Sequence, residues 1–373
     1  MTRARTRQNR RGFVLVTMAA SALVIFGALG LSVDIGRMYV AKSEVQAFTD
    51  AAALAATLRL NGTNSGFDAA RAAVANSINR WNFNSANVPS PQVDFATAMA
   101  GPWEANPASA AGYICTRVRA SVQVPLYFVG MVVAQSQSSV SAKSVAAQLP
   151  ISTMRRGLGP FTAVTTNPTD PDFGFTRDQQ YAIQWPAFNG GRHGCPAIPA
   201  NCFVQPPCAG DSNAALSAVA QYWGSANNGY WGDNSAHIIN QAILDLLQLQ
   251  PLSIGQLIAL NNGNKAAEAF ALDTRTNQDL DTIHNTVSAY LNDPYHNGRR
   301  FLAVPVVEPT AWGTYVRGYA SFLLITNGTP SDYYGRAHGN DPFCAIYAGS
   351  YVQGGTDPGG AGQTNAYRVA LVQ

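Results

Sequence analysis

The 373-residue chain has few charged side chains. They make up 12% of its residues, about half of the roughly 25% usual in soluble domains. The formal net charge of +3 describes the chain poorly, because five of its 24 basic residues lie within the first 11 positions and the remainder carries 19 basic against 21 acidic residues. Such a balance offers no basic surface to a nucleic-acid backbone and excludes that class of partner. The composition is typical of an exported envelope or surface protein.

Residues 12–33 carry no charge and predict a transmembrane helix. A hydrocarbon core of ~30 Å needs about 20 helical residues to cross it. The stretch is long enough and is rich in large apolar side chains. Its candidate membrane-spanning residues include Gly12, Phe13, Leu23, Phe26 and Val33. A cleaved signal peptide is the alternative, but its apolar region is shorter, about 7–15 residues, so the length favours a retained anchor.

The charges on either side of this stretch predict its orientation. Five arginines precede it and no acidic residue occurs before Asp34, whereas the charges that follow nearly balance. The positive-inside rule therefore places residues 1–11 in the cytoplasm as a basic tip. The rest of the chain, residues 34–373, is predicted to lie on the other side of the membrane, attached to it by a single span.

The helix is expected to continue beyond the membrane as a stem over residues 34–60. Val45, Phe48 and Ala52 recur at three- and four-residue spacing, which is typical of one helical face. Asn61 and Gly62 both tolerate the left-handed conformation found after a helix C-terminus. A continuous helix over residues 12–60 would extend roughly 70 Å at 1.5 Å per residue.

Residues 61–149 predict one helix and an antiparallel pair of strands. The helix carries one apolar face, formed by Phe67, Ala70, Val74, Ile78 and Trp81. A short strand is expected around residues 93–95. Residues 113–124 and 138–148 alternate between apolar and polar side chains, as half-buried strands do. The apolar linker between them, residues 125–133, is too short to span a membrane.

Residues 150–373 predict an extracytoplasmic α+β domain. A long irregular stretch over 150–210 precedes helices beginning at Asp211 or Ser212, covering 235–249, and beginning at Thr276 or Asn277. Four extended segments follow, at 301–307, 314–325, 344–352 and 366–372. The fold class is therefore α+β: an N-terminal transmembrane helix that extends into a long stem, then a mixed globular region with antiparallel strands.

Five cysteines are candidates for disulfides in an oxidising compartment: Cys115, Cys195, Cys202, Cys208 and Cys344. The odd count leaves at least one thiol free or paired between chains. The spacings within the cluster of three fit no familiar zinc pattern. No metal site is predicted.

No pattern in the chain indicates catalysis. It lacks a Gly-x-Ser-x-Gly elbow, a His-Glu-x-x-His pair and a phosphate-binding loop. Asp279 and Asp281 are expected to be solvated on a helix, and His284 is expected to lie on that same helix as a surface or satisfied core group. No catalytic, cofactor-binding or metal-binding residue is predicted. Two alternatives stay open: a membrane-anchored hydrolase, and a carbohydrate- or surface-binding adhesin.

The N-terminal segment resembles the TadE/TadG-like (Flp, or tight-adherence) pilus-assembly proteins. The features that match are the Arg11-Gly12 start, the uncharged span, Asp34-Ile35-Gly36-Arg37, Tyr39, Gln46 and the run containing Asp50, Ala51, Ala52, Leu54 and Ala55. The resemblance implies a structural component of a pilus machine, or a minor pilin-like subunit, held in a bacterial inner membrane by a single span with its body in the periplasm or at the cell surface. No cofactor is expected. Its implied partners are other pilus-assembly or pilin-like proteins, and the emergent helix could also contact copies of itself.

One departure from the family pattern concerns processing. Prepilin cleavage follows a glycine and favours glutamate five residues later, whereas the fifth residue after Gly12 is Thr17. We therefore hypothesise an uncleaved, TadG-like anchor, and cleavage after Gly12 stays an open alternative. The Asp-x-Ser-x-Ser motif of von Willebrand A domains is absent, so that domain is not predicted.

Overall fold

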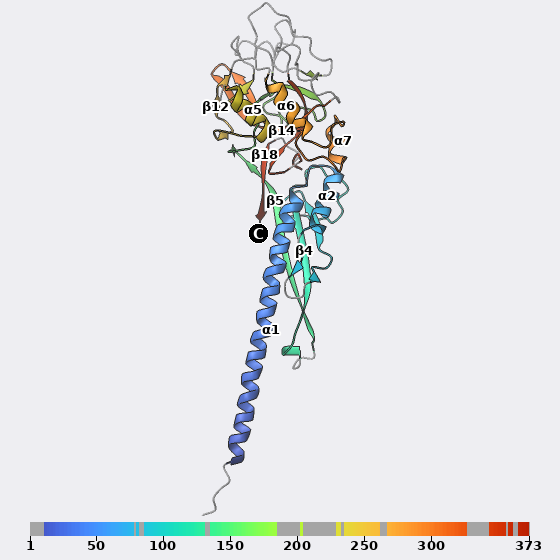
Figure 1. Ribbon diagram of the computed structural model, residues 1–373, viewed down its shortest axis with the longest axis vertical. Helices are drawn as coiled ribbons and strands as arrows, with labels where there is room; N and C mark the ends of the chain where they lie inside the picture. Colours follow the sequence, from blue (N-terminus) through green and yellow to red (C-terminus); the bar gives the residue numbers. More distant parts are fainter. Residues whose placement is uncertain are drawn as a thin grey trace, which may run out of the picture.

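A computed structural model of the protein describes residues 11–77, 80–81, 86–130, 135–184, 202–203, 229–232, 235–261, 267–326, 343–355, 357–360 and 365–372. Within these residues the fold is α+β, as predicted. A single long helix extends from a body that contains two large sheets, three two-stranded sheets and several shorter helices (Figure 1).

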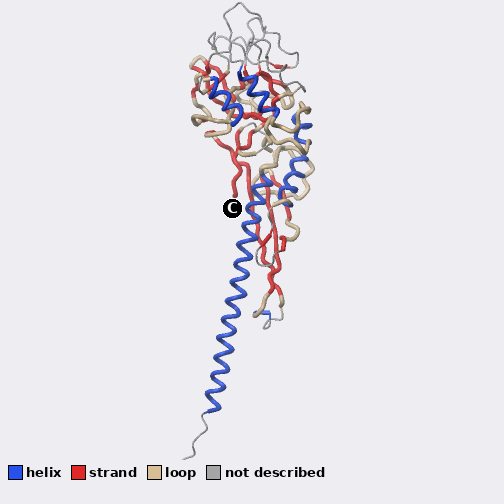
Figure 2. Tube along the Cα trace, in the orientation of Figure 1, coloured by secondary structure: helices blue, strands red, loops and turns tan. Residues whose placement is uncertain are grey.

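The long helix α1 covers Arg11–Thr57, which is 47 residues and about 70 Å at 1.5 Å per residue. The prediction of one unbroken helix is confirmed, and the helix ends three residues before the expected position. Its N-terminal part is long and apolar enough to cross a membrane, and its side chains there are almost all exposed. Figure 2 shows this part projecting alone, while the C-terminal part lies against strands.

The C-terminal half of α1 is held by a face of small and apolar side chains. Val45, Phe48 and Ala52 are buried, as the spacing predicted, together with further alanines on the same face. These residues pack in one cluster with side chains from β4 and β5, among them Val118 and Ala142. The small residues let the helix backbone approach the sheet closely.

The sheet that supports α1 has five strands in the order β17-β18-β5-β4-β3. Its strands are β3 (Gln92–Ala96), β4 (Cys115–Pro125), β5 (Gln137–Ile151), β17 (Tyr351–Gln353) and β18 (Ala366–Val372). Strands β4 and β5 are antiparallel from Cys115↔Ala147 to Pro125↔Gln137, which confirms the predicted pair. The C-terminal strand β18 pairs with β5, so the end of the chain returns to this first sheet.

Helix α2 (Asn64–Ala75) begins at Thr63, whose side chain accepts a hydrogen bond from the backbone of Gly66. Its buried face includes Phe67, Ala70 and Val74, as expected. The helix stops earlier than the sequence suggested. Trp81 lies instead in the short strand β1 (Arg80–Trp81), which pairs with β2 (Ala86–Asn87), and Ile78 lies outside the described residues.

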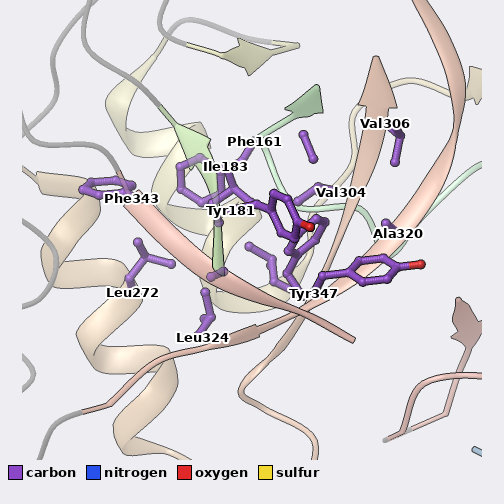
Figure 3. Packing of buried hydrophobic residues seen from close by; sticks show 14 of the residues in the cluster. Phe161, Tyr181, Ile183, Leu272, Val304, Val306, Ala320, Leu324, Phe343 and Tyr347 are labelled. Carbon is purple, nitrogen blue, oxygen red and sulfur yellow. The ribbon is translucent and has the colours of Figure 1, made fainter. Parts of the chain in front are cut away.

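The second sheet has the strand order β7-β14-β15-β16-β8-β9, with β12 also paired to β15. Its strands are β7 (Ala163–Val164), β8 (Gln180–Gln184), β9 (Cys202–Phe203), β12 (Leu257–Ile258), β14 (Phe301–Thr310), β15 (Gly313–Leu324) and β16 (Phe343–Gly349). Strands β14, β15 and β16 confirm three of the four extended segments predicted near the end of the chain, and β18 of the first sheet confirms the fourth. Aromatic side chains such as Phe161, Tyr181 and Tyr347 fill the core on one face of this sheet (Figure 3).

Three helices accompany the second sheet: α5 (Ala236–Asp245), α6 (Ala267–Asn277) and α7 (Val287–Asn292). Helix α5 is shorter than predicted because Leu246 adopts a left-handed conformation, with φ of 53°. The prediction that a helix begins at Thr276 or Asn277 is wrong, since α6 ends at Asn277 and α7 begins ten residues later, at Val287. The helix predicted at residues 211–212 lies outside the described residues.

The remaining two-residue strands form two small antiparallel sheets outside the two large ones. They are β6 (Thr153–Met154), which pairs with β11 (Leu252–Ser253), and β10 (Tyr230–Trp231), which pairs with β13 (Leu260–Asn261).

Candidate functional site

Many of the side chains that carry the resemblance lie where α1 meets the β4–β5 hairpin. We call the polar contacts between α1 and these two strands the seam, and residues 126–130, between β4 and the next described residues, the hairpin tip. The hairpin runs back along α1 toward the N-terminal part of the helix, so the tip lies beside the end of the apolar stretch (Figure 1).

Asp34 connects α1 to the hairpin tip. Its two carboxylate oxygens accept hydrogen bonds from the backbone N–H groups of Tyr127, Phe128 and Val129, at 3.0, 2.9 and 2.7 Å. The residue is 1% exposed although it lies on a helix surface. Desolvation raises the pKa of this carboxyl, but the three backbone donors and the charge of Arg37 outweigh it, so the net pKa is lowered. The ionised Asp34 carboxylate is therefore the acceptor for three backbone N–H groups of the hairpin tip.

Two further contacts place the tip on the helix. A Cβ atom added at Gly30 would lie 2.5 Å from the Cβ of Phe128, so the absence of a side chain at Gly30 makes room for this ring. One turn above Asp34, the guanidinium carbon of Arg37 lies 3.9 Å from the centre of the Tyr127 ring. Gly30, Asp34 and Arg37, which lie on successive turns of α1, thus contact the tip at residues 127–129.

The middle of the seam is centred on Ser144 of β5. Gln46 donates to the Ser144 hydroxyl at 2.9 Å and to Asp50 at 2.9 Å. The same hydroxyl donates to Asp50 at 2.5 Å and lies 2.7 Å from the hydroxyl of Thr49. Three helix side chains therefore converge on one strand residue, which sets the register between helix and strand.

The upper end of the seam is formed by Gln148, which is fully buried. Its side-chain nitrogen donates to the carbonyl oxygens of Thr57 and Leu60, at 3.0 and 2.8 Å, and its oxygen accepts from the backbone of Gly360. Thr57 also shares a buried hydrogen bond with Thr116 of β4. These contacts satisfy carbonyl groups at the helix C-terminus that have no partner within the helix.

The other residues that carry the family resemblance make no polar contact described above, and they differ in their burial. Ala52 is fully buried, Leu54 and Ala55 are half-buried, and Ala51 is exposed, as one face of a helix against a sheet requires. Gly36 has open space around it, and Tyr39 is 75% exposed. Arg11 and Gly12 lie in the first turn of α1.

The predicted membrane-spanning side chains are exposed, as lipid contact would need. Phe13, Leu23 and Phe26 are between 70 and 75% exposed, and Val33 is 49% exposed.

The cysteines divide into two kinds. Cys115 is a free thiol, fully buried in a cluster with Ala96 and Ala147, so it is not one of the disulfide partners for which it was a candidate. Burial raises the pKa of this thiol to about 11. Cys344 in β16 is disulfide-bonded. Cys195 and Cys208 lie outside the described residues, and Cys202 belongs to β9.

A polar cluster that the sequence did not predict lies next to α7. The ring nitrogen Nδ1 of His284 lies 3.1 Å from an Asp281 oxygen and 3.5 Å from an Asp293 oxygen. These three residues have the ligand types of a metal site. However, Asp281 also accepts hydrogen bonds from the backbone of Ile283 and His284, and it faces Arg300 at 3.7 Å. The Asp281 carboxylate therefore already has hydrogen-bond donors and a neighbouring cation within the protein.

The expectation that Asp279 and Asp281 are solvated on a helix is wrong. Both are almost completely buried, at 2 and 1% exposure, in a loop. Asp279 accepts hydrogen bonds from the Tyr290 hydroxyl and the Arg300 backbone, and Arg300 is itself fully buried. These contacts tie the segment between α6 and β14, which includes α7, to Arg300 at the start of β14.

A groove of about 710 Å³ lies where the upper end of α1 approaches the second half of the chain. Its lining includes Leu58, Arg156, Asp245, Tyr351 and Arg368. The residues that line it include charged groups but no serine, cysteine or histidine that could act as a nucleophile or a base. The hydrolase alternative gains no support from this groove.

The comparison with protein families identifies the same segment. The model of the TadE/G-like Flp pilus-assembly domain matches residues 12–76, which run from the second residue of α1 to the residue that follows α2. The resemblance is therefore confirmed over the segment that contains Asp34, Gln46 and Asp50. No curated protein matches the chain. No solved structure matches it either.

Proposed function

We propose that this chain, whose residues 12–76 carry a TadE/G-like segment, is a membrane-anchored structural or assembly component of a Tad (Flp) type pilus system. It acts through protein–protein contacts and not through catalysis. The family match supports a role in the Tad system, and the finer assignment to a TadG-like, uncleaved anchor is ours.

The observation that carries the proposal is the division of α1 into two halves. The first half exposes large apolar side chains all round, and the second buries one face against the β4–β5 hairpin. A helix that is apolar on every side is typical of a membrane span. A helix whose upper half is locked into a sheet keeps the folded body at a fixed position above that span.

We place the N-terminus in the cytoplasm and the body in the periplasm or at the cell surface. The arginines before the span support this orientation through the positive-inside rule. The disulfide bond of Cys344 also fits an oxidising compartment.

The contact surface for pilus partners is expected just above the membrane. Ile35, Tyr39 and Val40 are between 41 and 75% exposed on the part of α1 that the hairpin leaves uncovered. Other pilus-assembly or pilin-like proteins, or a second copy of this chain, would pack here.

The test is deletion of the gene in its own host, with surface pili scored by electron microscopy. One complementing chain is full length, and a second carries an unrelated transmembrane helix of equal length in place of residues 12–33. We expect loss of pili that the full-length chain restores. Normal piliation in the deletion strain would contradict the assembly role.

Orientation is tested separately, by adding protease to spheroplasts of the complemented strain. Digestion of the body is expected. A body that stays protected while a periplasmic control protein is degraded would contradict the proposed topology.

A further inference from the structure

The hairpin tip lies at the level of the apolar stretch of α1. Gly30, which the Phe128 side chain covers, belongs to residues 12–33 and precedes Val33 by three positions. At 1.5 Å per residue, this places the Gly30 contact about 4.5 Å inside the end of the apolar stretch. Any bilayer that covers the helix as far as Val33 therefore reaches Phe128.

The chemistry of the tip matches that position. Residues 126–130 read Leu-Tyr-Phe-Val-Gly and contain no charged side chain. Tyr127 and Phe128 are 56 and 47% exposed, although both are aromatic. Tyrosine is enriched at membrane–water interfaces, where its ring is apolar and its hydroxyl stays hydrated.

The backbone N–H groups of the tip also have hydrogen-bond partners within the protein, as a poorly hydrated environment requires. Irregular backbone is costly near lipid because its N–H groups have no water to bind. Here the N–H groups of Tyr127, Phe128 and Val129 all donate to Asp34. Arg37, one helical turn further from the apolar stretch than Asp34, lies over the Tyr127 ring.

We propose that the hairpin tip is a second membrane contact, which inserts Tyr127 and Phe128 into the interfacial region of the leaflet that faces the folded body. The inference rests on the proposed function in one respect, that α1 spans the membrane. The bilayer is the favoured occupant because the tip is fixed to the span itself by Gly30 and Asp34. Together, α1 and the tip restrict the tilt and rotation of the body relative to the membrane.

The experiment uses the full-length protein in nanodiscs of phosphatidylethanolamine and phosphatidylglycerol. A diazirine amino acid replaces Phe128, or in separate samples Leu23, Tyr127 or Trp312. After irradiation, mass spectrometry counts phospholipid adducts, adducts to a second chain and adducts to water. Leu23 is 75% exposed within the span, and Trp312 is 85% exposed at the turn between β14 and β15. These two positions are the positive and negative controls.

We expect phospholipid adducts at Leu23, Phe128 and Tyr127, and none above background at Trp312. Lipid adducts at Leu23 without any at Phe128 and Tyr127 would overturn the inference and leave the anchor intact. Absence of lipid adducts at Leu23 would contradict the anchor, and with it the proposed function. Adducts at Phe128 to a second chain would show that the tip is a protein contact and would also overturn the inference.

Discussion

The carboxylate of Asp34 lies 2.9 Å from the backbone nitrogen of Phe128, a residue 94 positions further along the chain. The backbone N–H groups of Tyr127 and Val129 donate to the same carboxylate, so three hydrogen bonds join the two segments. The end of the apolar stretch and the tip of a distant hairpin are therefore one structural unit. Movement of the helix must be transmitted to the sheet that carries the C-terminal strand.

Replacement of Asp34 by Asn should loosen the hairpin tip without unfolding the body. The amide keeps a single acceptor oxygen and presents N–H groups to three backbone donors, so some of these lose their partner. Hydrogen exchange followed by mass spectrometry should show faster exchange in the peptide that contains residues 127–129. Asp68→Asn is the control, because the Asp68 side chain is 80% exposed. An unchanged exchange rate at the tip in Asp34→Asn would contradict the proposal that Asp34 holds the tip in place.

The same contact predicts a pH dependence. The pKa of Asp34 is lowered from its ordinary value of 3.8. A depressed folded-state pKa means that the contact stabilises the fold above the unfolded-state pKa and that this stabilisation is lost as pH falls through the folded-state pKa. Pepsin, which is active at low pH, should cut the tip more slowly in the natural chain than in Asp34→Asn. The two rates should converge only below about pH 3.8. Equal rates throughout would contradict the prediction.

The sequence predicted α1 and the β4–β5 hairpin well because each has a strong local pattern. An uncharged apolar stretch and a three- and four-residue repeat continue through α1, and alternation marks both strands. The partners across the seam were not predictable in the same way. Ser144 and Gln148 look like ordinary polar positions on a strand. Their roles depend on contacts with residues 98 and 88 positions away in the sequence, which only the fold brings close.

The failure near residue 280 has a local physical cause. Leu280, Ile283, Val287 and Leu291 have helical spacing, but Leu280 and Ile283 are 74 and 72% exposed. Asp281 accepts hydrogen bonds from the backbone two and three residues later. Such bonds give the backbone an alternative to the helix. The helix therefore begins only at Val287, as α7, although the helical spacing starts at Leu280.

Glycine at position 30 should be favoured over alanine, in contrast with position 36. In a helix interior, alanine is normally more stable than glycine by roughly 0.5–1 kcal/mol. Gly36 has open space around it, so Gly36→Ala should raise the free energy of unfolding by about that amount. Gly30→Ala should give no such gain, because the new Cβ would meet the Phe128 Cβ at 2.5 Å. Denaturant unfolding of both variants in the same detergent checks this, and equal gains would contradict the close approach.

Replacement of Gln148 by Met should destabilise the seam while preserving its volume. The carbonyl oxygen of Leu60 and the backbone N–H of Gly360 would lose their partner in a buried site, whereas the carbonyl of Thr57 would keep the Leu60 N–H. Leaving a buried polar group unpaired costs about 1–3 kcal/mol. We expect the free energy of unfolding to fall by about 3 kcal/mol in thermal or urea unfolding. Gln137→Met, at the exposed start of the same strand, should change it by less than about 0.5 kcal/mol. Similar effects of the two substitutions would argue against the seam.

Cys115 should resist alkylation in the folded protein. Its thiol is fully buried, and burial raises its pKa to about 11, so the reactive thiolate is scarce at neutral pH. A raised folded-state pKa also means that any stabilisation from the neutral thiol is present below the ordinary value of 9.0 and is lost as pH rises through about 11. Peptide mass spectrometry after iodoacetamide treatment at pH 7.5 should find Cys115 modified only when the chain is unfolded first. Rapid labelling of the folded chain would contradict its burial.

Arg300 and Arg299 are neighbours in sequence that should respond very differently to replacement by Met. Arg300 is fully buried and donates to the carbonyl oxygens of Asp281 and Leu324 and to the side chain of Asn285. Its removal leaves those acceptors and a buried Asp281 carboxylate without their cation, which costs about 3–5 kcal/mol when a buried pair is broken.

Arg299 is exposed and donates to a single carbonyl oxygen, that of Leu244, so Arg299→Met should cost less than about 1 kcal/mol. Chemical denaturation of the two variants measures the difference. Hydrogen exchange at residues 127–129 should stay unchanged in both, because neither arginine contacts α1 or the hairpin tip through these bonds. If Arg300→Met cost no more than Arg299→Met, the loop between α6 and β14 would not depend on the buried cation. The acidic residues of that loop would then need another explanation for their burial.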